Sequence, residues 1–216
     1  MEGGPCLPHC RYNSKPARVA WALAIGFALF QACTLAGSAA APSLTQIMQN
    51  IAAATNIPQS MGFSQDIEAA GWLGKWHFSS TVVRDAQGVH VSAPKAPALI
   101  PTDFLADLAD FSEALREFEL NYSGKVVLAG KYDCYLVTGA RKPGVYSGAI
   151  QGSIWVDVST FLIRHIQIRY SWGTVDVEQT YEQQKEFTVL SRQDATVKPL
   201  PMRLTVKYSD YWFKSK

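Results

Sequence analysis

The chain has 216 residues, of which 48% are hydrophobic and 18% are charged. This composition is typical of a globular protein and excludes an intrinsically disordered chain, and the length favours one domain with short additions. Residues 1–40 hold three of the 20 basic and one of the 18 acidic residues, so 17 of each remain after them. A neutral remainder is not attracted by its net charge to nucleic acid or to an anionic membrane surface.

The first 40 residues predict export. A positively charged stretch, an uncharged apolar run over residues 19–35 and a run of small residues up to Ala40 follow one another. This is the layout of a secretory signal peptide, so we expect residues 1–40 to be cleaved near Ala40 and residues 41–216 to form one periplasmic domain. Two alternatives stay open: an uncleaved membrane anchor, and a lipid anchor at Cys33, which follows a loose lipobox.

The sequence offers no pattern for catalysis or for a metal. Cys134 is the one cysteine after residue 40, so no disulfide is expected within that part, and its place in an alternating strand predicts a buried, inert thiol. His77, His90 and His165 fall in separate strands without a second ligand or base nearby, and His77 and His165 are expected at the surface. We therefore expect no enzymatic activity, no metal and no cofactor.

Two helices are predicted. Apolar residues recur at helical spacing over residues 43–55, with Ser43 in position to cap the first turn. The second helix is expected over residues 102–117, where Phe104, Leu108 and Phe111 share an apolar face.

Strands are expected almost everywhere else. Between the helices a strand over residues 72–83 and a short return over 89–92 form a hairpin. After the second helix the alternation of apolar and polar residues predicts strands over 118–122, 125–128, 131–138, 149–156, 162–171, 175–185, 187–197 and 202–211. Short connections make successive strands antiparallel. The fold class is therefore α+β: a strongly curved antiparallel sheet, an incomplete β-barrel, with helices packed in its concave face.

Three segments resemble a known family. They are Lys131–Gly139 (KYDCYLVTG), Gly152–Tyr170 (GSIWVDVSTFLIRHIQIRY) and Lys198–Phe213 (KPLPMRLTVKYSDYWF). Together they resemble the LolA-like group, which includes outer-membrane lipoprotein carriers and the sigma-factor regulator RseB. Phe161 stands where many members have a glycine, and residues 62–65 faintly echo the family's first strand.

The resemblance implies an apolar cavity between the sheet and its helices that receives acyl chains of lipids or lipoproteins. The chain would then be a carrier or lipid-binding protein of the cell envelope, and the alternatives are an RseB-like sensor that binds an envelope membrane protein and, less favoured, an envelope enzyme. No nucleic acid partner is expected. The strand alternation and the second helix supply the residues expected to line the cavity: Trp76, Phe78, Phe104, Leu108, Phe111, Ile154, Val156, Ile166, Ile168, Val177, Leu204 and Val206.

Overall fold

The computed structural model describes residues 41–55, 58, 60–72, 74–97, 115–144 and 148–214. Contacts between residues divide the chain into two compact units, residues 1–41 and 42–216, and the fold given below is that of the second unit. Residues 1–40, assigned above to a signal peptide, and most of the predicted second helix lie outside the described residues. Within the described ranges, no helix is long and apolar enough to cross a membrane.

The first predicted helix is confirmed as α2 (Leu44–Thr55). Ser43 begins it with a reciprocal cap: the Gln46 backbone nitrogen donates to Ser43 Oγ at 3.2 Å, and the Ser43 backbone nitrogen donates to Gln46 Oε1 at 2.8 Å. Ile47 is fully buried, and Leu44, Met48 and Ile51 pack beside it against the core. The apolar stripe read from the sequence is therefore the face that α2 turns toward the sheet.

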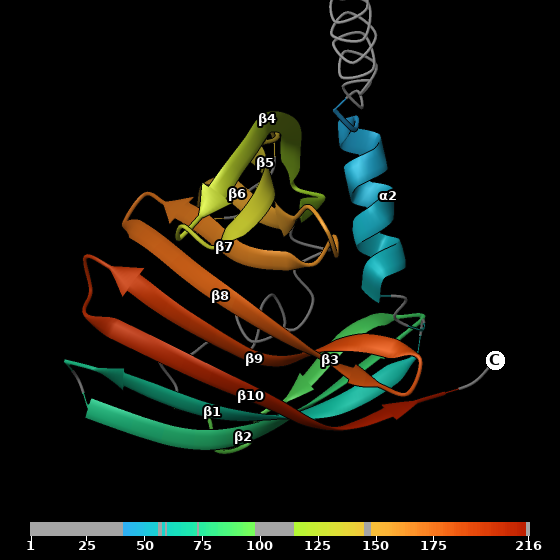
Figure 1. Cartoon of the computed structure of the whole chain (residues 1–216). Helices are drawn as coiled ribbons and strands as arrows, with labels where there is room; N and C mark the ends of the chain where they lie inside the picture. Colours follow the sequence, from blue (N-terminus) through green and yellow to red (C-terminus); the bar gives the residue numbers. More distant parts are fainter. Residues whose placement is uncertain are drawn as a thin grey trace, which may run out of the picture. The chain divides into compact units, whose positions relative to one another are not determined.

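All described strands form one antiparallel, ten-stranded sheet that is not closed (Figure 1). Its order is β3-β2-β1-β10-β9-β8-β7-β6-β5-β4, so β3 and β4 are its edges. Successive strands from β4 to β10 pair with one another, which confirms the predicted meander. The strands are β1 (Met61–Gly71), β2 (Gly74–Asp85), β3 (Gly88–Ser92), β4 (Phe118–Leu128), β5 (Tyr132–Arg141), β6 (Ala149–Asp157), β7 (Ile163–Tyr170), β8 (Gly173–Gln184), β9 (Phe187–Lys198) and β10 (Met202–Phe213).

Strand β1 was not predicted from the sequence, and the first strand was expected at residues 72–83. Trp72 instead lies in the turn between β1 and β2. The inward row of β1 contains Gln65 and Ala69 besides large apolar residues, which weakens the alternation on which the prediction depends. The faint family echo at residues 62–65 is therefore the start of the first strand of the sheet.

Bulges explain where the predicted faces were wrong. Gly124 does not end a strand but follows a bulge that keeps β4 continuous. A bulge opposite Trp155 and Val156 makes Ile163, rather than Leu162, the buried partner of Val156. Tyr211 packs against the core, because a register irregularity shifts the alternation near the end of β10.

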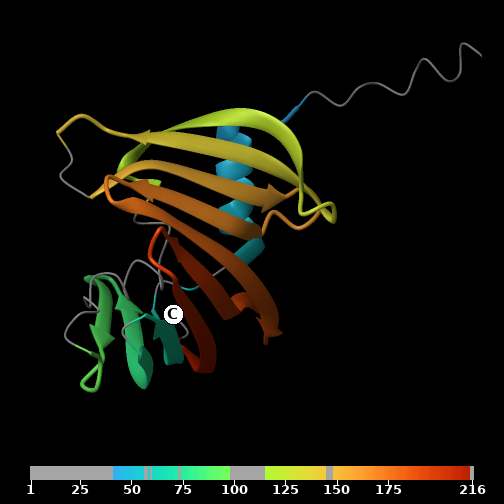
Figure 2. The same cartoon turned by 90° about the vertical axis from the view of Figure 1, so that its left-hand side faces the viewer.

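The sheet curves strongly around its inner face, as Figures 1 and 2 show. Helix α2 contacts both β9 and the edge strand β4, and four strands lie between these two in the sheet order. One helix can touch both because the intervening strands bend around it. The predicted curved, incomplete barrel with helical packing on its concave face is thus confirmed, with one helix in the described part of the chain.

Two glycines of the family-like segments have a packing role on the inner face. Gly139 and Gly152 pair across β5 and β6, and the buried Phe118 lies over both of them. A Cβ at Gly139 would lie 2.8 Å from Leu120 Cδ2 and 3.0 Å from Phe118 Cβ, whereas a Cβ at Gly152 would lie 3.6 Å from the Phe118 ring. The missing side chains therefore make room for Phe118 where edge strand β4 curls over the sheet.

We predict that Gly139→Ala lowers the free energy of unfolding by about 1–2 kcal/mol, because the new methyl group overpacks the Phe118 contact. Gly152→Ala is the matched control. Its Cβ meets only ordinary van der Waals contact, so we expect no loss and even a gain of about 0.5 kcal/mol from reduced chain entropy. Urea unfolding of both variants measures the difference, and equal destabilisation would contradict this account.

Candidate functional site

The predicted cavity-lining residues gather on the inner face of the sheet. Those in the described part of the chain all belong to one hydrophobic cluster: Trp76, Phe78, Ile154, Val156, Ile166, Ile168, Val177, Leu204 and Val206. Phe104, Leu108 and Phe111 lie outside the described residues. The tertiary structure therefore brings residues from β2, β6, β7, β8 and β10 onto one continuous apolar surface.

These residues are not equally accessible. Seven of them are buried, with 5% or less of each residue exposed: Phe78, Ile154, Val156, Ile166, Val177, Leu204 and Val206. Trp76 and Ile168 are only partly buried and pack at the border of the cluster. Trp76 and Ile168 are therefore the most accessible of the predicted lining residues in the described part of the chain.

A belt of polar side chains crosses this apolar face. Gln65 on β1, Ser80 on β2, Gln179 on β8 and Gln193 on β9 are all buried, and Tyr208 on β10 is buried among them. The register places them in a row, since Gln65 pairs with both Ser80 and Tyr208, and Gln179 pairs with Gln193. We call these five residues, together with Tyr181, the polar belt.

Each amide oxygen of the polar belt accepts a hydrogen bond from a hydroxyl group. Ser80 Oγ donates to Gln65 Oε1 at 2.6 Å, and the Tyr181 hydroxyl donates to Gln179 Oε1 at 2.9 Å. The Tyr208 hydroxyl donates to Gln193 Oε1. Because each amide oxygen already accepts a hydrogen bond from a hydroxyl group, the amide nitrogens are left to donate to other groups.

Within the described ranges, the Gln65 amide nitrogen is the buried donor for which no acceptor is found. Its side chain is 1% exposed, and no acceptor in this part of the chain meets hydrogen-bond geometry with Nε2. Burial also raises the pKa of the neighbouring Tyr208 hydroxyl. A buried donor without an acceptor costs about 1–3 kcal/mol, so an acceptor supplied at this point of the inner face would be stabilised.

The polar belt was not predicted, although the sequence contains a pattern that indicates it. Ser80 stands between the inward Phe78 and Val82, and Gln179 continues the inward row of Val175 and Val177. Polar residues in register with an apolar row are the pattern that would have located the belt. Only the apolar members of each row were predicted to line the cavity.

A second polar cluster lies at the turn between β6 and β7 and serves the fold. Asp157 accepts hydrogen bonds from the Ser159 side chain and backbone, from the Thr160 backbone and from Arg164. Burial alone would raise the pKa of Asp157, but these hydrogen bonds outweigh burial and lower it to about 2. The family-like Trp-Val-Asp segment therefore ends in a carboxylate that fixes a turn.

Phe161 completes this turn in the left-handed conformation, with φ of 56°. Only glycine adopts that conformation without steric cost, which agrees with the glycine that the family resembled by this segment often has there. The Phe161 ring stacks on Tyr135, with ring centroids 5.8 Å apart, so the larger side chain contributes packing in exchange.

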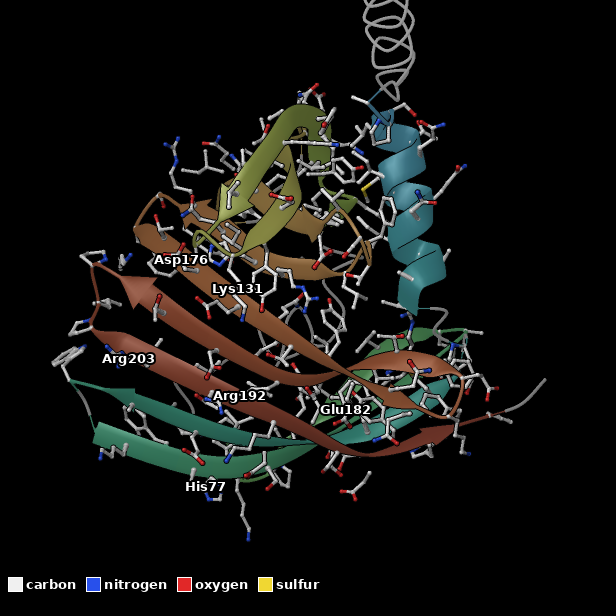
Figure 3. The ribbon with its side chains drawn as sticks, viewed as in Figure 1. His77, Lys131, Asp176, Glu182, Arg192 and Arg203 are labelled. Carbon is white, nitrogen blue, oxygen red and sulfur yellow. The ribbon has the colours of Figure 1, made fainter. Side chains whose placement is uncertain are left out.

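The histidines and the cysteine do not form a site in the described residues. His77 is exposed and contacts Asp66 at 2.6 Å, whereas His165, expected at the surface, is largely covered and lies edge-on to Trp155. Burial lowers the pKa of His165 and raises that of the buried Cys134 thiol. Arg192, labelled in Figure 3, pairs with Asp194 on the outer face. Within the described ranges, no group of three or more potential ligands is placed to hold a metal ion.

Comparison with known proteins identifies the fold. No family model and no curated protein sequence matches the chain. Among solved structures, the chain is similar to a DUF1329 family protein from Desulfovibrio piger, with 9% identity, a TM-score of 0.59 and coverage of 81% of this chain and 94% of that one.

Two further structures carry names that match the family resemblance. One is a domain described as outer membrane lipoprotein-sorting from Vibrio parahaemolyticus, with 11% identity, a TM-score of 0.61 and coverage of 78% of this chain and 91% of that one. The other is a LolA superfamily protein from Nitrosomonas europaea, with 10% identity, a TM-score of 0.58 and coverage of 82% and 96%. At these identities the similarity concerns the fold, and it confirms the predicted LolA-like architecture.

We predict that Asp157→Asn lowers the free energy of unfolding by about 2 kcal/mol at pH 7. This is the free energy that corresponds to the fall in the pKa of Asp157 from 3.8 to about 2 on folding. Because folding lowers this pKa, the stabilisation is complete above the ordinary value of 3.8 and is lost as the pH falls through about 2. The difference between wild type and variant should therefore shrink below pH 4. Denaturant unfolding from pH 7 to pH 2 measures it, with the exposed Glu186→Gln as control. A difference that stays constant with pH would refute this role.

Proposed function

We propose that the protein binds acyl chains of lipids or lipoproteins non-covalently on the inner face of its sheet, as a carrier of the cell envelope rather than an enzyme. The observation that carries the proposal is the apolar inner face of a sheet that does not close on itself. The shared fold with a lipoprotein-sorting domain supports it. Export through the predicted signal segment would bring the protein to such ligands.

The energetics favour an acyl ligand. Each buried methylene group contributes about 0.8 kcal/mol, so a long acyl chain offers on the order of 10 kcal/mol before the cost of immobilisation. Apolar burial has no directional requirement, so one surface accepts chains of different length and supports loading and release. The partly buried Trp76 and Ile168 border the area where the chain would lie.

The polar belt gives this surface a position for a carbonyl group. Acyl chains in lipids and lipoproteins are joined through esters or amides, whose carbonyl oxygens accept hydrogen bonds. Gln65 Nε2 is a buried donor that lacks an acceptor. An acyl carbonyl placed at Gln65 would satisfy this donor while the hydrocarbon lies along the apolar rows on either side of the belt.

We predict that Ile168→Trp weakens binding of a fluorescent acyl probe at least tenfold, because the larger ring fills the space beside the inner face. The protein is purified from the cell envelope in the form that the cells produce and is then delipidated. Binding of the probe is measured by fluorescence titration. Glu178→Trp is the matched control, since Glu178 is exposed on the neighbouring strand β8. Equal affinities for both variants and wild type, or no binding by the wild type, would refute the proposed function.

We predict that Gln65→Leu preserves binding of hydrocarbon but removes discrimination between ester and ether lipids of equal chain length. The wild type should bind the ester form about fivefold to tenfold more tightly, as expected for one hydrogen bond of about 1 kcal/mol. Ser80→Ala, which removes only the partner of Gln65 Oε1, serves as comparison. If the wild type binds both lipids equally, the role of the polar belt fails while acyl binding stands.

A further inference from the structure

Neighbouring connections of the sheet lie side by side at one end of its strands. Ala70 pairs with Arg203, which places the β1–β2 turn beside the β9–β10 turn. A Cβ at Gly173 would lie 2.0 Å from the Lys198 carbonyl oxygen, so the β7–β8 turn touches the β9–β10 turn as well. The start of β6 pairs with the end of β7 and comes next.

Figure 2 views the molecule from this side. We call this end the turn rim; it consists of the described residues among 70–75, 141–150, 169–174 and 197–203.

Exposed hydrophobic side chains concentrate on the turn rim. Trp72 is 69% exposed, Trp172 51% and Leu200 44%, and these three lie in three different turns. Ile150, 38% exposed, lies at the start of β6. The Trp172 ring stacks on Tyr170 with centroids 4.9 Å apart and planes 14° from parallel. Because Tyr170 packs against the core, Trp172 is held in place while one of its faces stays in water. A patch of this kind marks an interaction surface.

Basic side chains accompany the exposed hydrophobic ones. Lys75 follows the β1–β2 turn, Lys142 follows β5, Arg169 precedes the β7–β8 turn and Arg203 follows the β9–β10 turn, and all four are exposed. Arg203 is labelled in Figure 3 near the left-hand ends of β9 and β10. The turn rim is thus both apolar at its tips and positively charged around them.

Carboxylates do not cancel this charge. Asp176 is the acidic residue closest to the β7–β8 turn, and it accepts a hydrogen bond from Gln167 and lies 3.6 Å from Lys198 Nζ. Glu117 and Glu119 lie at the start of the edge strand β4, beyond the row of tryptophan-bearing turns. The β8–β9 turn at the opposite end of the strands instead carries Glu182 and Glu186.

We propose that the turn rim docks on the surface of an anionic phospholipid bilayer. Tryptophan is enriched at the level of lipid head groups, where its ring is buried and its N–H stays hydrated, and lysine and arginine are attracted to anionic lipids. The rim combines both on turns that the sheet holds in one row. This inference is independent of acyl binding, because none of its residues belongs to the polar belt or to the predicted lining.

The test is a vesicle flotation assay at low salt, with the protein in the form that the cells produce. One set of vesicles contains equal amounts of phosphatidylglycerol and phosphatidylcholine, and the other contains phosphatidylcholine alone. The wild type should bind the anionic vesicles at least tenfold more strongly. Lys75→Gln with Arg203→Gln should weaken that binding roughly thirtyfold, from about 1 kcal/mol per basic residue. Trp72→Ala with Trp172→Ala should weaken binding to both kinds of vesicle at least tenfold.

Matched variants at the other end of the strands serve as controls. Trp212→Ala, at a site 44% exposed, and Lys185→Gln with Lys214→Gln should leave binding unchanged, and circular dichroism verifies that all variants fold. Equal binding to both vesicles by the wild type would overturn the proposal. So would equal losses in the control variants, or binding that none of the substitutions alters, which would place the membrane contact in another part of the chain.

Discussion

The fold depends on one constraint: a long antiparallel sheet with an apolar face has to keep that face from water. Ten strands supply more apolar surface than the one helix of the described residues could cover on a flat sheet. The sheet therefore curves until α2 reaches both β9 and the edge strand β4, and its inner rows pack into one cluster. The bulges in β4 and β7 and the glycine pair of β5 and β6 allow this curvature. Apolar burial thus determines the architecture, and the same surface is the basis of the proposed ligand binding.

The polar belt is the exception within that apolar face. Burying amides and hydroxyls is unfavourable unless they are paired, and the belt pairs each glutamine oxygen with a hydroxyl group. Gln65 Nε2 is left over, in the middle of a face that is otherwise well packed. An apolar residue at this position would serve a permanent core better. The proposed binding of an acyl carbonyl depends on this buried donor.

The two ends of the strands differ in character. At the Asp157 end, hydrogen bonds hold a buried carboxylate and a strained Phe161 in a tight turn, so the chemistry stabilises the fold. At the turn rim, large hydrophobic and basic side chains are exposed to water. A protein that binds lipid on its inner face and approaches a bilayer with one end of its strands would have both properties needed to exchange ligands with a membrane.

The sequence by itself determined the secondary structure of most of the sheet, because alternation with period two and turn residues are local signals. The helix at residues 44–55, the hairpins and the apolar inward rows follow from it, and so does the family-like fold. It did not determine β1, whose inward row is interrupted by Gln65, nor the faces after a bulge, since one extra residue reverses the alternation. Net charge predicted no attraction to an anionic surface, because a sum over the chain carries no information on position. Only the tertiary structure aligned Gln65 with Tyr208 and brought Trp72 and Arg203 to one end of the strands, because β1 pairs with β10 although these strands lie more than a hundred positions apart in the sequence.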